Sequence, residues 1–198
     1  MLKSYLQKGL IEAGCDEAGR GCLAGPVYAA AVILPPRVRF PHLNDSKKLN
    51  EFTRDKLREQ IEKKAIAWAV GICTEREIEE FNILNCSILA MHRAVQQLQV
   101  RPEHLLIDGN HFKPYDLIPH TTIIKGDGKF RSIAAASILA KTHRDEFMKK
   151  LAKEFPAYGF EKHKGYGTAQ HVQAIDELGY LDCHRKTFNL KKLQKSDK

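Results

Sequence analysis

The sequence predicts a single α/β domain whose mixed β-sheet is covered by helices. Apolar runs of strand length alternate with longer segments in which apolar residues recur at helical spacing. The first two runs are close enough to pair as a hairpin, whereas the later runs are separated by loops and followed by helices, which together indicate a mixed sheet. The length of 198 residues and the hydrophobic content of 43% suit one domain of this kind.

The amino-terminal half is expected to form a hairpin, a helix and a third strand. Strands are predicted at 10–16 and 26–34, a helix at 50–64 and a further strand at 65–73. A short glycine-containing link joins the first two strands, so we expect them to pair antiparallel. Asn50 is suited to cap the helix, and Leu57 and Ile61 are spaced to share its buried face.

The carboxyl-terminal half is expected to contain more helix. We predict a helix at 75–99 that is broken near 82–85, strands at 105–107 and 121–124, a long helix at 132–154, a loop at 156–168 and a helix at 169–178. The small side chains at 134–136 suit close packing of the long helix on the sheet. Residues 1–155 are therefore assigned to the core. Residues 156–198 are expected to be a loop and helical extension that forms one unit with it and ends in a Lys-rich tail or a short last helix.

Composition narrows the class of protein. The formal charge of +8 favours a polyanionic partner such as a nucleic acid, although solvated Lys-rich helices give the same charge. Five cysteines, an odd number with no C-x-x-C pair, argue against a disulfide framework and a zinc ribbon, and favour free thiols in a reducing cytoplasm. The start of the chain lacks a signal-peptide core, and the longest apolar run, at 27–34, is too short to span a membrane.

Carboxylates occur at three places where a predicted strand ends near a glycine. These are the pair Asp16-Glu17, then Asp108 and Asp127. Strand ends of one sheet can converge in space, and clustered carboxylates repel one another unless a cation lies between them. Oxygen ligands without His or Cys favour Mg²⁺ or Mn²⁺ over zinc. Asp before Gly is also a common turn residue, so each position taken alone has a plain structural interpretation.

Glycine-rich segments next to cations are candidate substrate contacts. The backbone of Gly19-Arg20-Gly21 can approach a sugar or phosphate closely because no Cβ obstructs it. Tyr166 lies between glycines in a basic loop, where its ring is as plausible a stacking platform as a core residue.

Ser46, Lys47 and four histidines are further polar residues for which the sequence suggests a role. Ser46 and Lys47 are suited to bind a phosphate, although a solvated loop is the simpler interpretation of that stretch. No H-E-x-x-H pattern occurs, and four histidines are expected to be surface or capping residues rather than metal ligands: His92, His104, His143 and His171.

Six blocks in this order resemble the bacterial ribonuclease HII family over about residues 12–188. They are Asp16-Glu17-Ala18-Gly19-Arg20-Gly21, Leu43-Asn44-Asp45-Ser46-Lys47-Lys48-Leu49, Ile107-Asp108-Gly109-Asn110, Lys125-Gly126-Asp127, Ala135-Ala136-Ser137-Ile138-Leu139-Ala140-Lys141 and His163-Lys164-Gly165-Tyr166. The chain departs from the usual family pattern at Cys22 and Gly167, where the family often has proline.

The resemblance implies a ribonuclease H-like fold with a C-terminal helical extension. It implies that Asp16, Glu17, Asp108 and Asp127 hold two Mg²⁺ or Mn²⁺ ions in the substrate complex. It also implies that Gly19, Arg20 and Gly21 sense a ribose 2′-hydroxyl and that Tyr166 stacks on the sugar of the next deoxynucleotide.

The expected activity is hydrolysis of the RNA strand of RNA–DNA hybrids and cleavage 5′ of single ribonucleotides in duplex DNA, leaving 3′-hydroxyl and 5′-phosphate ends. The enzyme is expected to be a cytoplasmic monomer without membrane contact. Two rival functions stay open: a DNA-strand nuclease of similar fold, and a non-catalytic module that binds RNA–DNA hybrids.

Overall fold

The computed structural model describes residues 2–44 and 46–188 and contains a five-stranded mixed sheet. The strands are β1 (Glu12–Ala18), β2 (Val27–Ile33), β3 (Ala67–Cys73), β4 (His104–Asp108) and β5 (His120–Ile123), in the spatial order β3-β2-β1-β4-β5. β1, β2 and β3 pair antiparallel, whereas β4 pairs parallel with both β1 and β5. The predicted mixed sheet and its amino-terminal hairpin are therefore confirmed.

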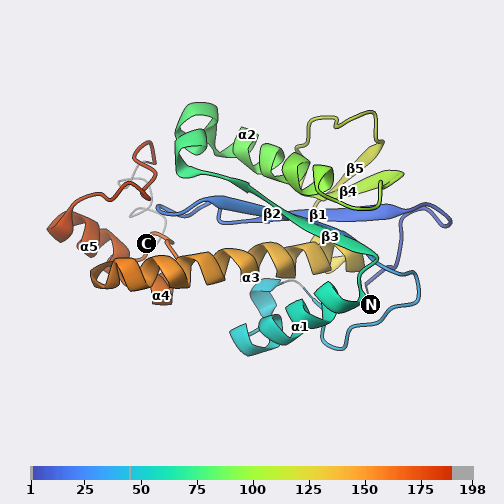
Figure 1. Ribbon diagram of the computed structural model, residues 1–198, viewed down its shortest axis with the longest axis horizontal. Helices are drawn as coiled ribbons and strands as arrows, with labels where there is room; N and C mark the ends of the chain where they lie inside the picture. The colour runs from blue at the N-terminus through green and yellow to red at the C-terminus, as the bar shows by residue number, and fades with distance from the viewer. Residues whose placement is uncertain (1, 45, 189–198) are drawn as a thin grey trace.

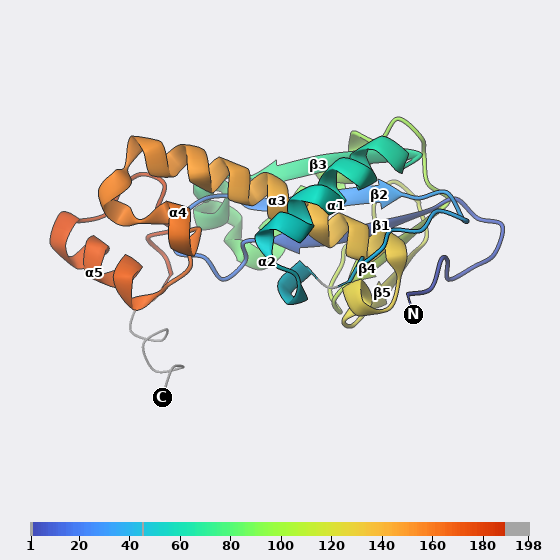
Figure 2. The same cartoon turned by 90° about the horizontal axis from the view of Figure 1, so that it is seen from below.

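Helices cover both faces of this sheet (Figure 1). They are α1 (Glu51–Lys64), α2 (Glu75–Gln96), α3 (Arg131–Glu154), α4 (Phe160–His163) and α5 (Ala169–Leu178). α2 packs on one face, and α3 packs on the other with α1 beside it. α4 and α5 lie beyond the sheet, next to the carboxyl end of α3 (Figure 2).

Local sequence signals explain where the first two helices begin and bend. The side chain of Asn50 caps α1, and Leu57 and Ile61 are buried on its inner face, as predicted. Thr74 begins a capping box at the start of α2. The predicted break in this helix occurs at Asn82, whose φ of 65° lies outside the helical region.

The site depends on how closely α3 approaches β1. The side chains of Ala134, Ala135 and Ala136 are fully buried, as expected for a helix that packs tightly on a sheet. Gly14 lies beneath the first turn of α3, where a larger residue would collide with the helix backbone. The small residues on both elements thus set the distance between α3 and the carboxyl end of β1.

Two predictions about the carboxyl-terminal part were wrong. The segment 156–168 was expected to be a loop, but it contains a 3-10 turn at Pro156–Tyr158 and the short helix α4. His104 and His171 were expected at the surface or at caps, but both are buried, because each makes hydrogen bonds that satisfy its ring inside the fold. The proposed tail at 191–198 and Asp45 lie outside the described residues.

The described residues contain no helix that is long and apolar enough to cross a membrane. All five cysteines are free thiols, as predicted.

Candidate active site

Three aspartates meet at the carboxyl edge of the parallel strands. Cys15 of β1 is paired with Ile107 of β4, so the next residues along, Asp16 and Asp108, are neighbours on adjacent strands. Asp127 lies in the turn that follows β5. Among the described residues, these three aspartates form a group in which one carboxylate oxygen of each lies within 4.8 Å of the others.

Asp16 is buried at the end of β1. Its side chain accepts a hydrogen bond from the backbone N–H of Glu17 at 2.7 Å. Burial raises the pKa of Asp16 well above its usual range, and the charges of Glu17 and Asp108 raise it further, whereas a hydrogen bond from Ser137 opposes the shift. Ionised Asp16 is therefore unfavourable in the absence of a cation.

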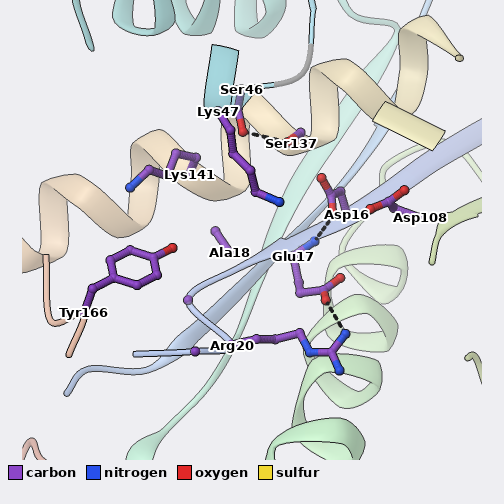
Figure 3. A pocket seen from close by; sticks show the side chains of 12 residues that line it. Asp16, Glu17, Ala18, Arg20, Ser46, Lys47, Asp108, Ser137, Lys141 and Tyr166 are labelled. Carbon is purple, nitrogen blue, oxygen red and sulfur yellow. Dashed lines mark hydrogen bonds and ion pairs between the residues drawn. The ribbon is translucent and has the colours of Figure 1, made fainter. Parts of the chain in front are cut away.

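Glu17 lies in the same cavity but outside the three-aspartate group. It points to the other side of β1 from Asp16 (Figure 3), as the alternation of side chains along a strand requires. Its carboxylate lies 3.2 Å from the guanidinium of Arg20. Burial raises the pKa of Glu17, and Arg20 partly offsets that effect. One predicted metal ligand is thus paired with one predicted substrate contact.

A cavity of about 380 Å³ gathers nine of the ten residues that the sequence singled out. They are Asp16, Glu17, Gly19, Arg20, Gly21, Ser46, Lys47, Asp108 and Tyr166. Asp127 does not line this cavity, but its carboxylate belongs to the same group as those of Asp16 and Asp108, which do.

Ser46 and Lys47 lie in the cavity wall in different ways. Ser46 is buried, and its hydroxyl lies 2.9 Å from the hydroxyl of Ser137. Ser137 in turn lowers the pKa of Asp16, so Ser46 contacts a residue that favours the ionised form of this acid. The side chain of Lys47 extends toward the acids (Figure 3).

Tyr166 forms the wall opposite the acids, and the residue is 40% exposed (Figure 3). Its backbone forms an isolated bridge with Cys22, and the Cys22 side chain raises the pKa of the Tyr166 phenol. Burial raises the pKa of Tyr166 to about 12, so the phenol stays protonated. Cys22, a departure from the family pattern, therefore has a direct contact with the predicted stacking residue.

Two polar residues of α3 that were not predicted as site residues also line the cavity. Ser137 and Lys141 lie one helical turn apart. The ammonium of Lys141 lies 2.7 Å from Asp145 and 5.6 Å from the centroid of the Tyr166 ring. Their i, i+4 spacing in the sequence places both side chains on the same face of the helix.

Two buried arginines hold the loops around the cavity, and no sequence pattern pointed to them. Arg144 and Arg185 are 0% and 1% exposed. Their guanidinium groups donate to backbone carbonyls of Arg20, Ala24, Gly25, Pro26 and Lys164. From the sequence alone, both arginines would be expected at the surface, where most arginines lie.

Comparisons with known proteins agree on one family. The family model described as Ribonuclease HII matches residues 13–191. Ribonuclease HII of Phocaeicola vulgatus is 64% identical over 190 residues, which cover 96% of this chain and 94% of the relative.

Two solved structures share the fold. Ribonuclease H2 from Pyrococcus horikoshii OT3 has a TM-score of 0.77 at 23% identity and covers 93% of this chain and 97% of its own. Bst-RNase HIII in complex with Mn²⁺ has a TM-score of 0.69 at 20% identity, over 95% of this chain and 70% of its own. These likenesses confirm the predicted ribonuclease H-like fold. The chain belongs to the ribonuclease HII family and is a ribonuclease H, an endoribonuclease that acts on RNA–DNA hybrids.

Proposed function

We propose that this protein is a divalent-metal-dependent endonuclease with two related substrates. It hydrolyses the RNA strand of RNA–DNA hybrids, and it cuts duplex DNA on the 5′ side of a single embedded ribonucleotide. Both reactions leave a 3′-hydroxyl and a 5′-phosphate. The observation that carries the proposal is the single cavity that Asp16, Glu17 and Asp108 share with Tyr166 and the backbone of Gly19–Gly21.

The donor set fits a hard divalent cation. Asp16, Asp108 and Asp127 offer carboxylate oxygens within 4.8 Å of one another, and this group contains no thiol or imidazole. Oxygen ligands of this kind favour Mg²⁺ or Mn²⁺, and Bst-RNase HIII, which shares the fold, has been solved with Mn²⁺. When bound, two such ions supply an activated water and stabilise the leaving 3′ oxygen.

The residues of the chain have separate tasks in this proposal. Asp16, Asp108 and Asp127 hold the cations, and Glu17 completes the acidic set. Ser137 favours the ionised form of Asp16. The raised pKa of Asp16 supports this assignment, because burial and the neighbouring charges of Glu17 and Asp108 both disfavour the ionised acid, and a bound cation would favour it.

The opposite wall of the cavity is proposed to recognise the sugars. Nothing lies within 4 Å of the position that a Cβ on Gly21 would take, so the backbone there is open to a ligand. Gly19, Arg20 and Gly21 would test one sugar for its 2′-hydroxyl, which is both donor and acceptor. The exposed ring of Tyr166 would press on the next sugar, and Ser46 and Lys47 would lie near the phosphate. The net charge of +8 supports a polyanionic partner but does not distinguish RNA from DNA.

We further propose that the protein works as a cytoplasmic monomer in the removal of ribonucleotides from DNA. Residues 1–155 and 156–198 would act as one unit. The support for this is an apolar cluster that joins Met148 and Leu151 of α3 to Phe160 and Val172 of the extension.

The test is a cleavage assay with protein freed of metal by a chelator. An RNA–DNA hybrid should stay intact until Mg²⁺ or Mn²⁺ is added, and the products should then carry 3′-hydroxyl and 5′-phosphate ends. The Asp16→Asn variant is the matched control, since it keeps the shape of the side chain and removes a charged ligand. Full cleavage without a divalent cation, or products with 2′,3′-cyclic phosphate ends, would contradict the proposal. Cleavage of an all-DNA duplex would instead favour the rival DNA nuclease.

A further inference from the structure

Three histidines are buried directly behind the Tyr166 loop. His163, His171 and His184 are 8%, 0% and 1% exposed, and all three contact the ring of Phe160. The rings of His163 and His171 stack with their centroids 4.4 Å apart. None of the three lies in the cavity or has a role in the hydrolysis proposed above.

The hydrogen bonds of two of these histidines have only one consistent direction. The backbone N–H of Leu181 donates to Nδ1 of His184 at 2.8 Å, so a neutral His184 carries its proton on Nε2. Nε2 of His184 lies 3.1 Å from Nε2 of His171 and must donate to it. His171 then carries its own proton on Nδ1, which lies 2.9 Å from the backbone carbonyl oxygen of Tyr166. A directed chain thus runs from Leu181 to Tyr166.

The third histidine holds the neighbouring peptide. The backbone N–H of Gly165 donates to Nδ1 of His163 at 3.2 Å. Nε2 of His163 therefore carries the proton and donates to the carbonyl of Tyr158 at 2.8 Å. Two successive backbone groups are therefore held by buried histidines: the N–H of Gly165 by His163, and the carbonyl of Tyr166 by His171.

We propose that His171 and His184 are positioning residues for Tyr166, acting as a neutral, directed pair that fixes the backbone from which the ring projects. The inference rests on the proposed function of Tyr166 in reading the junction between a ribonucleotide and DNA. Protonation of His171 would place two N–H groups against each other across 3.1 Å. Protonation of His184 would place its Nδ1–H against the N–H of Leu181 across 2.8 Å, so the directed chain that ends at Tyr166 requires both rings to be neutral.

The surroundings of the pair keep it neutral. Burial lowers the pKa of His171 to about 4, and burial also lowers the pKa values of His163 and His184. The titratable or charged groups that face the three rings are Tyr158, Glu161, Lys164, Tyr166, Tyr180 and Lys186. Glu161 is the one acid among them, so the balance of charge opposes a further proton.

The tautomers can be measured directly in the wild-type protein. Long-range proton–nitrogen correlation spectra of protein labelled with ¹⁵N in histidine separate the two neutral tautomers and the charged form. At pH 7 we expect His171 to be protonated at Nδ1, and His163 and His184 at Nε2. A charged His171, or one protonated at Nε2, would overturn the proposal without reference to activity.

The positioning role is tested by substrate preference at pH 7. The readout is the ratio of kcat/KM for a duplex with one ribonucleotide to kcat/KM for an RNA–DNA hybrid. Both substrates are hydrolysed by the same acidic residues, so an effect on hydrolysis itself changes both values equally and leaves the ratio unchanged. His171→Leu removes the donor to Tyr166 and should lower this ratio about fivefold, the factor typical of one lost hydrogen bond. His171→Asn places an amide N–H where Nδ1 was, and should restore the ratio to within about twofold of wild type.

The matched control is His104→Asn, which alters a buried histidine bonded to Thr121 of β5 and should leave the ratio unchanged. A ratio that His171→Leu does not move, or that falls equally in His171→Asn, would overturn the positioning role. Tyr166→Ala distinguishes failure of the proposed function of Tyr166 from failure of the positioning role of the histidines. If Tyr166→Ala leaves the ratio unchanged, the proposed function of Tyr166 fails and the positioning role fails with it, whatever the tautomer spectra show.

Discussion

Gly14 of β1 lies directly against the backbone of Ser132 in the first turn of α3. A Cβ on Gly14 would come within 2.2 Å of the carbonyl carbon of Ser132 and within 2.3 Å of the amide nitrogen of Ile133. Backbone atoms in a packed helix cannot retreat as the end of a flexible side chain can. This contact sets the distance between α3, which carries Ser137, and the strand that carries Asp16.

The first prediction compares two glycine substitutions. Gly14→Ala should destabilise the protein by roughly 3 kcal/mol or more, because it overpacks the contact between a strand and a helix. Gly21→Ala meets nothing within 4 Å and should leave the free energy of unfolding unchanged, while it slows cleavage at a single ribonucleotide by obstructing the sugar. Urea unfolding and kcat/KM measure the two effects. A Gly21→Ala enzyme with normal cleavage would remove that backbone from the recognition of the sugar.

The second prediction concerns the buried acid Asp16. Because its pKa is raised in the folded state, ionised Asp16 opposes folding at pH values above its unfolded pKa of about 3.8. Asp16→Asn should therefore raise the melting temperature of the metal-free protein at pH 7, and raise it less at pH 4, while it removes most turnover. Calorimetry at the two pH values is the measurement. If Asp16→Asn instead lowers the melting temperature at pH 7, the ionised carboxylate of Asp16 stabilises the folded protein through its partners, contrary to the prediction.

Much of this fold and site was predictable from local patterns in the sequence. The hairpin, the Asn50 cap, the break at Asn82 and the acids at strand ends all depend on neighbours in the chain. The roles of Arg144 and Arg185 were not predictable, because their acceptors are carbonyls of distant loops. The same holds for His171, whose burial depends on packing against Phe160 and His163.

The third prediction concerns metal and stability. Millimolar Mg²⁺ should raise the melting temperature of the wild-type protein by mass action on the folded state. For a chain of this length each kcal/mol of stabilisation corresponds to roughly 2–4 °C. Asp127→Asn should shrink the shift, since Asp127 supplies one of the three converging oxygens. Thermal scans with and without Mg²⁺ measure this, and a shift that Asp127→Asn leaves intact would place the ion elsewhere.

The fourth prediction separates the ring of Tyr166 from its hydroxyl. Stacking on an aromatic ring is worth roughly 1–3 kcal/mol per base in comparable contacts, and contact with a sugar should fall at the lower end. Tyr166→Phe keeps the ring and loses only the hydroxyl, so it should be more active than Tyr166→Ala. Steady-state kinetics on the single-ribonucleotide duplex give the comparison. Equal losses in both variants would assign the effect to the hydroxyl, and wild-type rates in both would exclude Tyr166 from the site.

The central claim is that one cavity reads the junction between a ribonucleotide and DNA. Gly19–Gly21 would test one sugar for a 2′-hydroxyl, and Tyr166 would accept only a deoxyribose next to it. The positive charge of the chain binds all phosphates alike and cannot make this choice.

The most direct measurement uses three duplexes of equal length and sequence, in which one strand contains no ribonucleotide, one ribonucleotide or only ribonucleotides. With Mg²⁺ or Mn²⁺, we expect the all-DNA duplex to stay intact and the single-ribonucleotide duplex to be cut once, on the 5′ side of the ribonucleotide. Cleavage confined to the all-RNA strand, with the single-ribonucleotide duplex intact, would contradict the account and leave a general hybrid nuclease.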